Sequence, residues 1–204
     1  MPLKPVLLPF GKTIYQTDLG QSVSSDNTYL VDLVLQKTDL NPLSALDLGC
    51  GNGILALMLA HYRPKWNISG IEIQPHLADL ARKNCLLTQA DNIVIYQQDL
   101  RLWISQERYD IIFSNPPYYP QTSGRLSPLK EKAISRHEIS CTMRDILSFI
   151  KHYLKISGKA YLIYPSERTA DMQNFSKKVD LIIEEEFFFK NNKKEKKVFS
   201  LTHR

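Results

Sequence analysis

The chain has 204 residues, of which 43% are hydrophobic and 23% are charged, and these values are typical of a globular domain. Three cysteines exclude a paired disulfide framework and favour a reducing compartment. The longest clearly apolar stretch, residues 53–62, is too short to cross a bilayer. Since the N-terminus also lacks a signal-peptide pattern, we expect a cytoplasmic protein with no membrane partner.

The positive charge is concentrated near the C-terminus. Lys and Arg number 26 and Asp and Glu 21, a net charge of +5. Residues 190–204 contain one anion, Glu195, and six cations: Lys190, Lys193, Lys194, Lys196, Lys197 and Arg204. This segment therefore accounts for the whole excess. It suits a polyanionic partner such as nucleic acid, but a solvated loop would have the same composition.

Short apolar runs alternate with helical patterns along most of the chain. In chain order, the patterns predict a helix (27–36), a strand (44–48), a helix (54–62), a strand (68–73), a helix (76–87), two strands (93–96 and 109–114), a helix (142–154) and a strand (159–164). Such alternation predicts a parallel sheet with helices on both faces.

The two ends of the chain and one internal segment depart from this alternation. Residues 181–189 and 198–202 are strand-like, and no helix fits between them, so they predict an antiparallel hairpin. Gly158 is expected to end the preceding helix in a left-handed cap. Residues 119–136 have no clean period and predict a long loop, which in a compact domain tends to be functional or disordered.

A glycine-rich turn follows the first strand of the alternating region and opens a helix. It contains Gly49, Gly51 and Gly53 directly after Asp47. Glycines allow a sharp turn and let a ligand lie against bare main chain. Glu72 and Asp99 end the next two strands, so three acidic residues are expected in one crevice at the carboxyl edge of the sheet.

The acidic residues discriminate between cofactors. Asp47 would lie close to the pyrophosphate of a dinucleotide, which disfavours that cofactor. S-adenosylmethionine has no phosphate, and its positively charged sulfonium and ammonium suit Asp47 and the backbone carbonyls around Gly49. We expect Glu72, followed by Ile73, to accept from the ribose hydroxyls, and Asp99 to accept from the adenine amino group, with Leu100 on the ring. Helix capping is the structural alternative for Glu72 and Asp99. Residues 44–118 resemble the class I methyltransferases.

The sequence Asn115-Pro116-Pro117-Tyr118 follows the strand at 109–114. Two prolines stiffen the turn and remove two donors, which leaves the Asn115 side-chain oxygen and the Pro116 carbonyl as acceptors and Tyr118 as a flat face. This combination suits a planar –NH2 on a conjugated system, held for attack by positioning and electrostatics. The alternative is a rigid turn without chemistry. The motif resembles that of amino-methyltransferases acting on adenine, cytosine, guanine or glutamine.

The residues around this motif narrow the resemblance. Residues 124–128 and 131–142, which include Arg136, His137 and Glu138, are similar to blocks in the bacterial tRNA1(Val) adenine-N6-methyltransferases, which modify the adenine next to the anticodon. Ser127 and Ser135 stand where that family has Asn and Ala. Upstream, Asp26 before a leucine-rich helix resembles the family segment that lines the cofactor entrance. The resemblance covers residues 16–202.

The resemblance makes several residues candidates for substrate binding. Beyond the motif, the candidates are Pro117, Tyr119, Arg125, Lys132, Arg136, Lys193, Lys194, Lys196 and Lys197, for which surface or capping roles are the alternative. The cysteines form no Cys-x-x-Cys pair, so no metal site is indicated.

Together, the patterns and the resemblance imply a Rossmann-like α/β class I methyltransferase with a seven-stranded mixed sheet and an antiparallel C-terminal hairpin. We expect one domain over residues 1–204, with a cofactor-lid and substrate segment (1–43) and a core (44–204). The implied reaction is S-adenosylmethionine-dependent N6-methylation of a tRNA adenine. Rivals are glutamine methylation of a release factor, disfavoured by the short segment before the first strand, methylation of rRNA or DNA bases, and non-catalytic RNA binding.

Overall fold

The computed structural model describes all residues except 1, 18–23, 40, 42, 117–140 and 192–193. Its core is a seven-stranded sheet in the order β5-β4-β3-β6-β7-β9-β8. The strands of this sheet are β3 (Ser44–Leu48), β4 (Asn67–Glu72), β5 (Ile93–Gln97), β6 (Tyr109–Ser114), β7 (Leu154–Pro165), β8 (Leu181–Asn191) and β9 (Lys194–His203). Strands β3 to β7 pair in parallel, and β9 pairs antiparallel with both β7 and β8. The predicted mixed sheet and C-terminal hairpin are confirmed.

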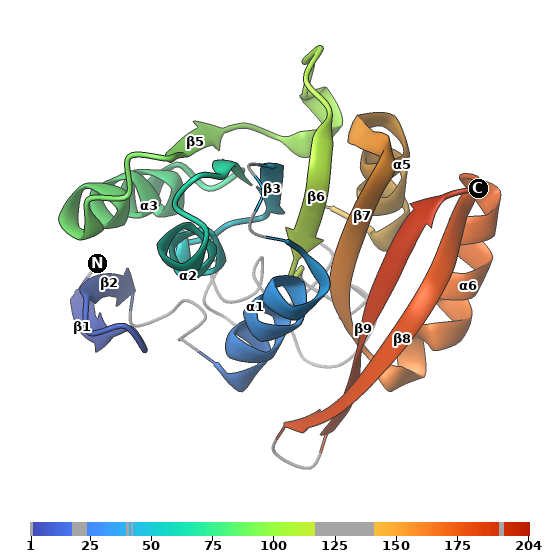
Figure 1. Ribbon diagram of the computed structural model, residues 1–204, viewed down its shortest axis with the longest axis horizontal. Coiled ribbons are helices and arrows are strands. Elements are labelled where there is room, and N and C mark those ends of the chain that lie inside the picture. Colours follow the sequence, from blue (N-terminus) through green and yellow to red (C-terminus); the bar gives the residue numbers. More distant parts are fainter. Residues whose placement is uncertain (1, 18–23, 40, 42, 117–140, 192–193) are drawn as a thin grey trace.

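Helices cover both faces of this sheet (Figure 1). One face packs against α1 (Ser25–Lys37), α2 (Ile54–Tyr62) and α3 (Pro75–Thr88), and the other against α5 (Met143–Tyr153) and α6 (Thr169–Lys178). Helix α2 is buried on all sides from Ile54 to Ala60, which explains why its sequence is apolar throughout. Helix α5 begins with a capping box, in which Thr142 and Asp145 each accept from the other's backbone N–H.

A strand pair and a helix were not predicted. Strands β1 (Leu3–Leu7) and β2 (Thr13–Thr17) form a separate antiparallel pair. The buried Asn84 of α3 holds this pair, donating to the carbonyl of Tyr15 at 2.8 Å and accepting from its N–H at 2.9 Å. The unpredicted helix is α6. Two short 3-10 turns, η1 (Leu100–Leu102) and η2 (Ser166–Arg168), complete the fold, and no helix among the described residues is long and apolar enough to cross a membrane.

The expected left-handed cap at Gly158 is wrong. Gly158 lies inside β7, its φ is not positive, and a Cβ there would meet the carbonyl oxygen of Asp110 at 2.8 Å and Cδ1 of Leu154 at 2.9 Å. Strand β7 begins at Leu154, directly after α5, so no loop residue is needed there. The glycine is therefore required by the close approach of β6 and β7 rather than by its backbone angles.

We expect Gly158→Ala to lower the free energy of unfolding by about 1–3 kcal/mol, because the added methyl group overpacks the site against backbone. Urea unfolding measures the change. Ser157→Ala, at the exposed neighbouring position, is the matched control and should stay within about 0.5 kcal/mol of the parent. Equal stability of the two variants would contradict the packing account.

Candidate functional site

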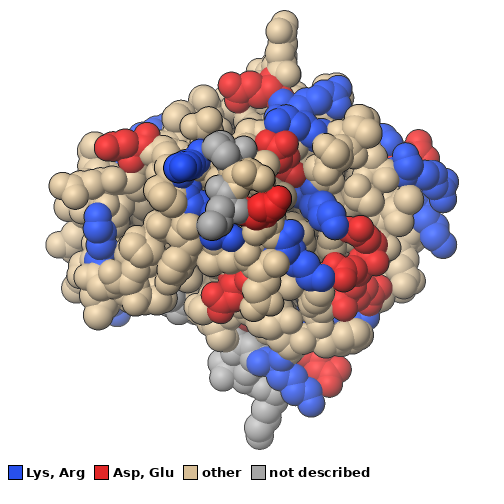
Figure 2. All heavy atoms as spheres, viewed as in Figure 1, with Lys and Arg blue, Asp and Glu red and all other residues tan. Residues whose placement is uncertain are grey.

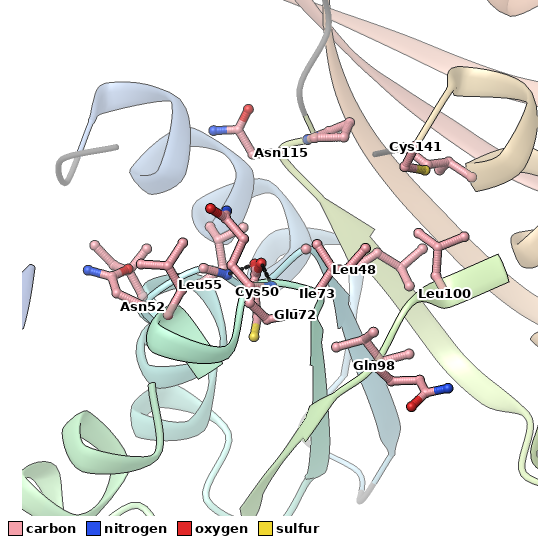
Figure 3. Close-up of a pocket in the computed structure, with 18 of the residues that line it drawn as sticks. Leu48, Cys50, Asn52, Leu55, Glu72, Ile73, Gln98, Leu100, Asn115 and Cys141 are labelled. Atoms are coloured by element: carbon pink, nitrogen blue, oxygen red, sulfur yellow. Dashed lines mark hydrogen bonds between the residues drawn. The ribbon is translucent and has the colours of Figure 1, made fainter. Parts of the chain in front are cut away.

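A pocket opens at the carboxyl edge of the parallel strands (Figure 3). Its wall contains residues that follow β3, β4, β5 and β6, as expected for ligand sites in open parallel sheets. Eight of the residues predicted from the sequence line it: Gly49, Gly51, Glu72, Ile73, Asp99, Leu100, Asn115 and Pro116. Segments from four neighbouring strands therefore converge on one cavity.

The glycine turn exposes bare backbone to this pocket. Gly49 and Gly51 have positive φ angles of 71° and 56°, and a Cβ built on either would meet no atom within 4 Å. The amides of Gly49 and Cys50 both donate to the carbonyl of Ile71, at 2.9 and 3.0 Å, and this fixes the turn against β4. A flat ligand can thus approach the main chain closely here.

Gly53 has a different role from the one expected. It also has a positive φ, 85°, but it is the N-cap of α2 and is absent from the pocket wall. A Cβ there would lie 3.3 Å from that of Ala81 on α3. Gly53 therefore allows α2 and α3 to pack closely, and its assignment as a cofactor contact is corrected.

Glu72 lies at the centre of the pocket floor and fastens the glycine turn (Figure 3). Its Oε2 accepts from the amide of Gly51 at 2.9 Å, and its Oε1 accepts from the amide of Gln74 at 2.8 Å. Burial raises the pKa of Glu72, while these backbone hydrogen bonds oppose the rise. Each carboxylate oxygen has a further lone pair, so the side chain can accept from two adjacent hydroxyl groups.

Asp47 does not face the pocket, and its predicted contact with the cofactor is corrected. The residue is fully buried in β3 and absent from the pocket wall. Its Oδ2 accepts from the amide of Ala56 at 3.3 Å, and its Oδ1 has no partner among the described residues. Burial raises the pKa of Asp47 to about 8. The side chain therefore stabilises the first turn of α2 through the amide of Ala56 and does not face the pocket.

Asp99 lines the pocket as predicted, and it also caps η1. Its carboxylate accepts from the backbone amide of Arg101 at 2.9 Å and pairs with the guanidinium of the same residue at 2.6 Å. The hydrogen bond from the side chain of Arg101 is the main reason why the pKa of Asp99 is lowered. The charged carboxylate thus remains an acceptor at the pocket edge, next to the apolar side chain of Leu100.

Asn115 projects from the end of β6 on the opposite side of the pocket from Glu72 (Figure 3). Strand β6 is anchored just before it, where the hydroxyl of Ser114 donates to the carbonyl of Leu48 at 2.6 Å. The Nδ2 of Asn115 donates to Oδ1 of Asn27 at 2.9 Å, while its own Oδ1 is buried without a partner among the described residues. An unused acceptor in a buried position suits a ligand that brings an N–H donor.

The structure corrects the roles of Asp26, Lys196 and Lys197. Lys196 and Asp26 form a buried ion pair between β9 and α1, with side chains 7% and 6% exposed. The ammonium of Lys197 lies 2.7 Å from Glu186 and 4.5 Å from the ring centre of Phe188. Neither lysine is free to contact a nucleic acid, and Asp26 does not line the pocket.

The described Lys and Arg residues form no single basic patch on the face of the molecule shown in Figure 2. Figure 2 shows Lys and Arg interspersed with Asp and Glu, including near the end of the β8–β9 hairpin. There Lys190 lies 3.5 Å from Glu195. The remaining predicted residues lie outside the described part of the chain, as does the side chain of Lys194. They are Pro117, Tyr118, Tyr119, Arg125, Lys132, Arg136 and Lys193.

Several pocket residues were not predicted. They include Gln16, Thr17, Asn27, Gln74, Gln98 and Cys141. Thr17 and Gln16 enter the pocket through the unpredicted hairpin, so no signal in the sequence marked them. Asn27 directly follows Asp26, which was predicted to line the cofactor entrance. Its position at the start of a predicted helix, next to that residue, was the signal that could have identified it.

Comparison with known proteins gives one family match and several relatives. The methyltransferase small domain family matches residues 28–133. A tRNA1(Val) (adenine(37)-N6)-methyltransferase from Porphyromonas gingivalis is 33% identical over 147 residues, which are 69% of this chain and 57% of the relative. A release factor glutamine methyltransferase from Streptococcus pneumoniae is 36% identical over 140 residues, 65% of this chain and 50% of the relative. The chain thus spans 57% of the length of the first relative and 50% of the second.

Solved structures share the fold. A methyltransferase from Pyrococcus furiosus superposes with a TM-score of 0.70 at 18% identity, covering 96% of this chain and 91% of the other. A magnesium protoporphyrin IX methyltransferase from Synechocystis, solved with bound SAM, gives a TM-score of 0.63 at 16% identity, with 88% and 78% covered. These superpositions establish the Rossmann-like methyltransferase fold.

Proposed function

Because the chain belongs to the methyltransferase small domain family, we propose that it transfers a methyl group from S-adenosylmethionine to N6 of an adenine in tRNA, next to the anticodon. The observation that carries this proposal is the buried Oδ1 of Asn115, which has no partner in the part of the chain that the structure describes and lies in the same pocket as Glu72 and the glycine turn. The name of the Porphyromonas relative supports the tRNA substrate, and a tRNA-modifying role implies a cytoplasmic location.

The pocket residues fit the proposed cofactor. The carboxylate of Glu72 would accept from the ribose hydroxyls, and the open backbone at Gly49 and Gly51 would allow close approach. Leu100 and Ile73 would pack beside the adenine, with Asp99 accepting from its amino group. When bound, S-adenosylmethionine would supply an electrophilic methyl group, and its transfer leaves a neutral thioether and one proton to be released.

The substrate side of the pocket holds the amine. Oδ1 of Asn115 accepts one amine hydrogen, the Pro116 carbonyl accepts the other, and Tyr118 stacks on the base. The amine lone pair is delocalised into the ring, so holding both hydrogens favours a nitrogen whose lone pair points to the methyl group. No strong base is required. The target adenine must leave its stack, which costs less in an anticodon loop with unstacked bases.

In this proposal, residues 1–43 contribute to the part of the pocket that binds the cofactor. We propose that they belong to one domain with the core at residues 44–204, which is supported by Thr17 and Asn27 lining the pocket. The residues proposed to contact the RNA near the target base are Pro117, Tyr119, Arg125, Lys132, Arg136, Lys193 and Lys194.

A second candidate is methylation of a glutamine side chain in a release factor. The Streptococcus relative, 36% identical over 140 residues, favours it, and a glutamine amide offers the same conjugated –NH2. Incubation with labelled S-adenosylmethionine and, separately, total tRNA, rRNA, DNA and a release factor distinguishes the candidates. Label in N6-methyladenine of tRNA supports our proposal, whereas label only in the release factor supports the alternative.

We expect Glu72→Ala to weaken S-adenosylmethionine binding by about 10- to 100-fold, because hydrogen bonds to a charged group contribute about 1.5–3 kcal/mol. The variant also removes the acceptors that fasten the amides of Gly51 and Gln74. Isothermal titration calorimetry gives the affinity. Glu167→Ala, at an exposed position, should bind like the parent, and unchanged affinity in Glu72→Ala would refute the ribose contact.

A further inference from the structure

The first turn of α1 faces the end of β6 across the pocket. Asn27 is 4% exposed and lines the same cavity as Asn115. Its Oδ1 accepts from Nδ2 of Asn115 at 2.9 Å, a contact between side chains 88 positions apart. The residue that is proposed to hold the target amine is thus itself held by a second asparagine.

This hydrogen bond decides which way the Asn115 amide faces. A side-chain amide has two donor hydrogens on one side and an acceptor oxygen on the other, and a half-turn exchanges them. With Nδ2 of Asn115 pointing to Asn27, the Oδ1 atom faces away from Asn27 and has no hydrogen-bond partner within the described ranges. The reversed amide would present two donors to the amine, which also has only donors to offer, and no hydrogen bond would form.

Helix α1 is fixed so that Asn27 can act as a rigid reference point. Asp26, the preceding residue, forms the buried ion pair with Lys196 of β9. One turn along, the ring of Tyr29 stacks on that of Phe189 at 4.2 Å between centres, and Lys37 pairs with Glu185 at 2.9 Å. The C-terminal hairpin therefore holds α1 along its length, which restricts the movement of Asn27.

We propose that Asn27 is the positioning residue of the methyl-transfer site, and that it keeps the carbonyl oxygen of Asn115 directed at the target amine. This inference rests on the proposed function and extends it to a residue that does not itself touch the reacting atoms. It requires only an acceptor at position 27, because the role of Asn27 is to receive the Nδ2 hydrogen.

Two substitutions separate this role from a packing role. Asn27→Ala removes the acceptor, so kcat should fall by about 10- to 100-fold, while KM for tRNA and the cofactor affinity change less than about threefold. Asn27→Asp can only accept, so the Asn115 amide keeps its orientation and kcat should stay within about fivefold of the parent. Asn174→Ala, on the exposed face of α6, is the matched control and should behave like the parent.

The side-chain amide of Asn115 provides a readout that is independent of activity. In 15N-labelled protein, its NH2 signals are identified by their loss in Asn115→Ala. They should be protected from exchange with solvent in the parent and in Asn27→Asp, and should exchange faster in Asn27→Ala. If the parent transfers no methyl group, the proposed function fails, and these signals still decide whether Asn27 orients Asn115. Equal exchange in all three proteins, or an Asn27→Asp as impaired as Asn27→Ala, would overturn the inference.

Discussion

Asn115→Ala is expected to reduce methyl transfer by at least about 100-fold, since a preorganised hydrogen-bonding group at a reacting centre contributes about 100- to 1000-fold to kcat. The substitution removes the buried Oδ1 that has no partner among the described residues. We expect it to leave Glu72 and the glycine turn unchanged, because among the described residues Asn115 hydrogen-bonds to Asn27 and not to them. Cofactor affinity should therefore remain close to that of the parent.

Methyl incorporation into tRNA measures the rate of transfer, and calorimetry with S-adenosylmethionine measures the cofactor affinity of the same protein sample. Asn174→Ala serves as the control for an asparagine removed from an exposed helix. An Asn115→Ala variant with full activity would remove this residue from the mechanism. A variant that loses cofactor binding in parallel would show that Asn115 supports the cofactor rather than the amine.

Asp26→Ala is expected to lower the free energy of unfolding by about 3–5 kcal/mol, because removing one member of a buried ion pair leaves the other charge uncompensated. The pair with Lys196 is 6% and 7% exposed and joins α1 to β9 across 170 positions of sequence. Lys196→Met leaves the buried Asp26 carboxylate without this partner, so it should lower the free energy of unfolding by a similar amount.

The pair between Lys37 and Glu185 is the natural control, since it joins the same helix to the same hairpin with side chains 34% and 40% exposed. Lys37→Ala should cost no more than about 1 kcal/mol. Urea unfolding of Asp26→Ala, Lys196→Met and the double variant gives the coupling energy of the buried pair. Additive effects, or an Asp26→Ala as stable as Lys37→Ala, would contradict the account.

The order of the elements could be predicted from the sequence because each strand and helix carries a local pattern. Helix α2 was predicted with its observed bounds, since nine consecutive residues are apolar or aromatic apart from His61. The β1–β2 pair was missed because Pro5 interrupts a five-residue run in which four positions are exposed. Helix α6 was missed because only Met172 and Ser176 of its ten residues are buried.

Site residues were predicted correctly where their position follows from the local sequence. They were mispredicted where contacts with residues far away in the sequence determine the surroundings of the side chain. The glycine turn follows β3 and Glu72 is the last residue of β4, so their place at the sheet edge follows from topology. Asp47 lies within a strand that is buried on both faces, and no pattern tells which side chain of such a strand points to a pocket. Lys196 reads as one member of a charged run, and its partner Asp26 is identified only by the folded chain.

A crystal structure with bound S-adenosylhomocysteine is the most direct test of the central claim that one cavity serves both the methyl donor and the amine. Our account predicts ribose hydroxyls within hydrogen-bonding distance of the Glu72 carboxylate, with the sulfur directed towards the space in front of Oδ1 of Asn115. A ligand bound elsewhere would contradict the account. So would a sulfur so far from Asn115 that a substrate nitrogen hydrogen-bonded to its Oδ1 could not reach the methyl group.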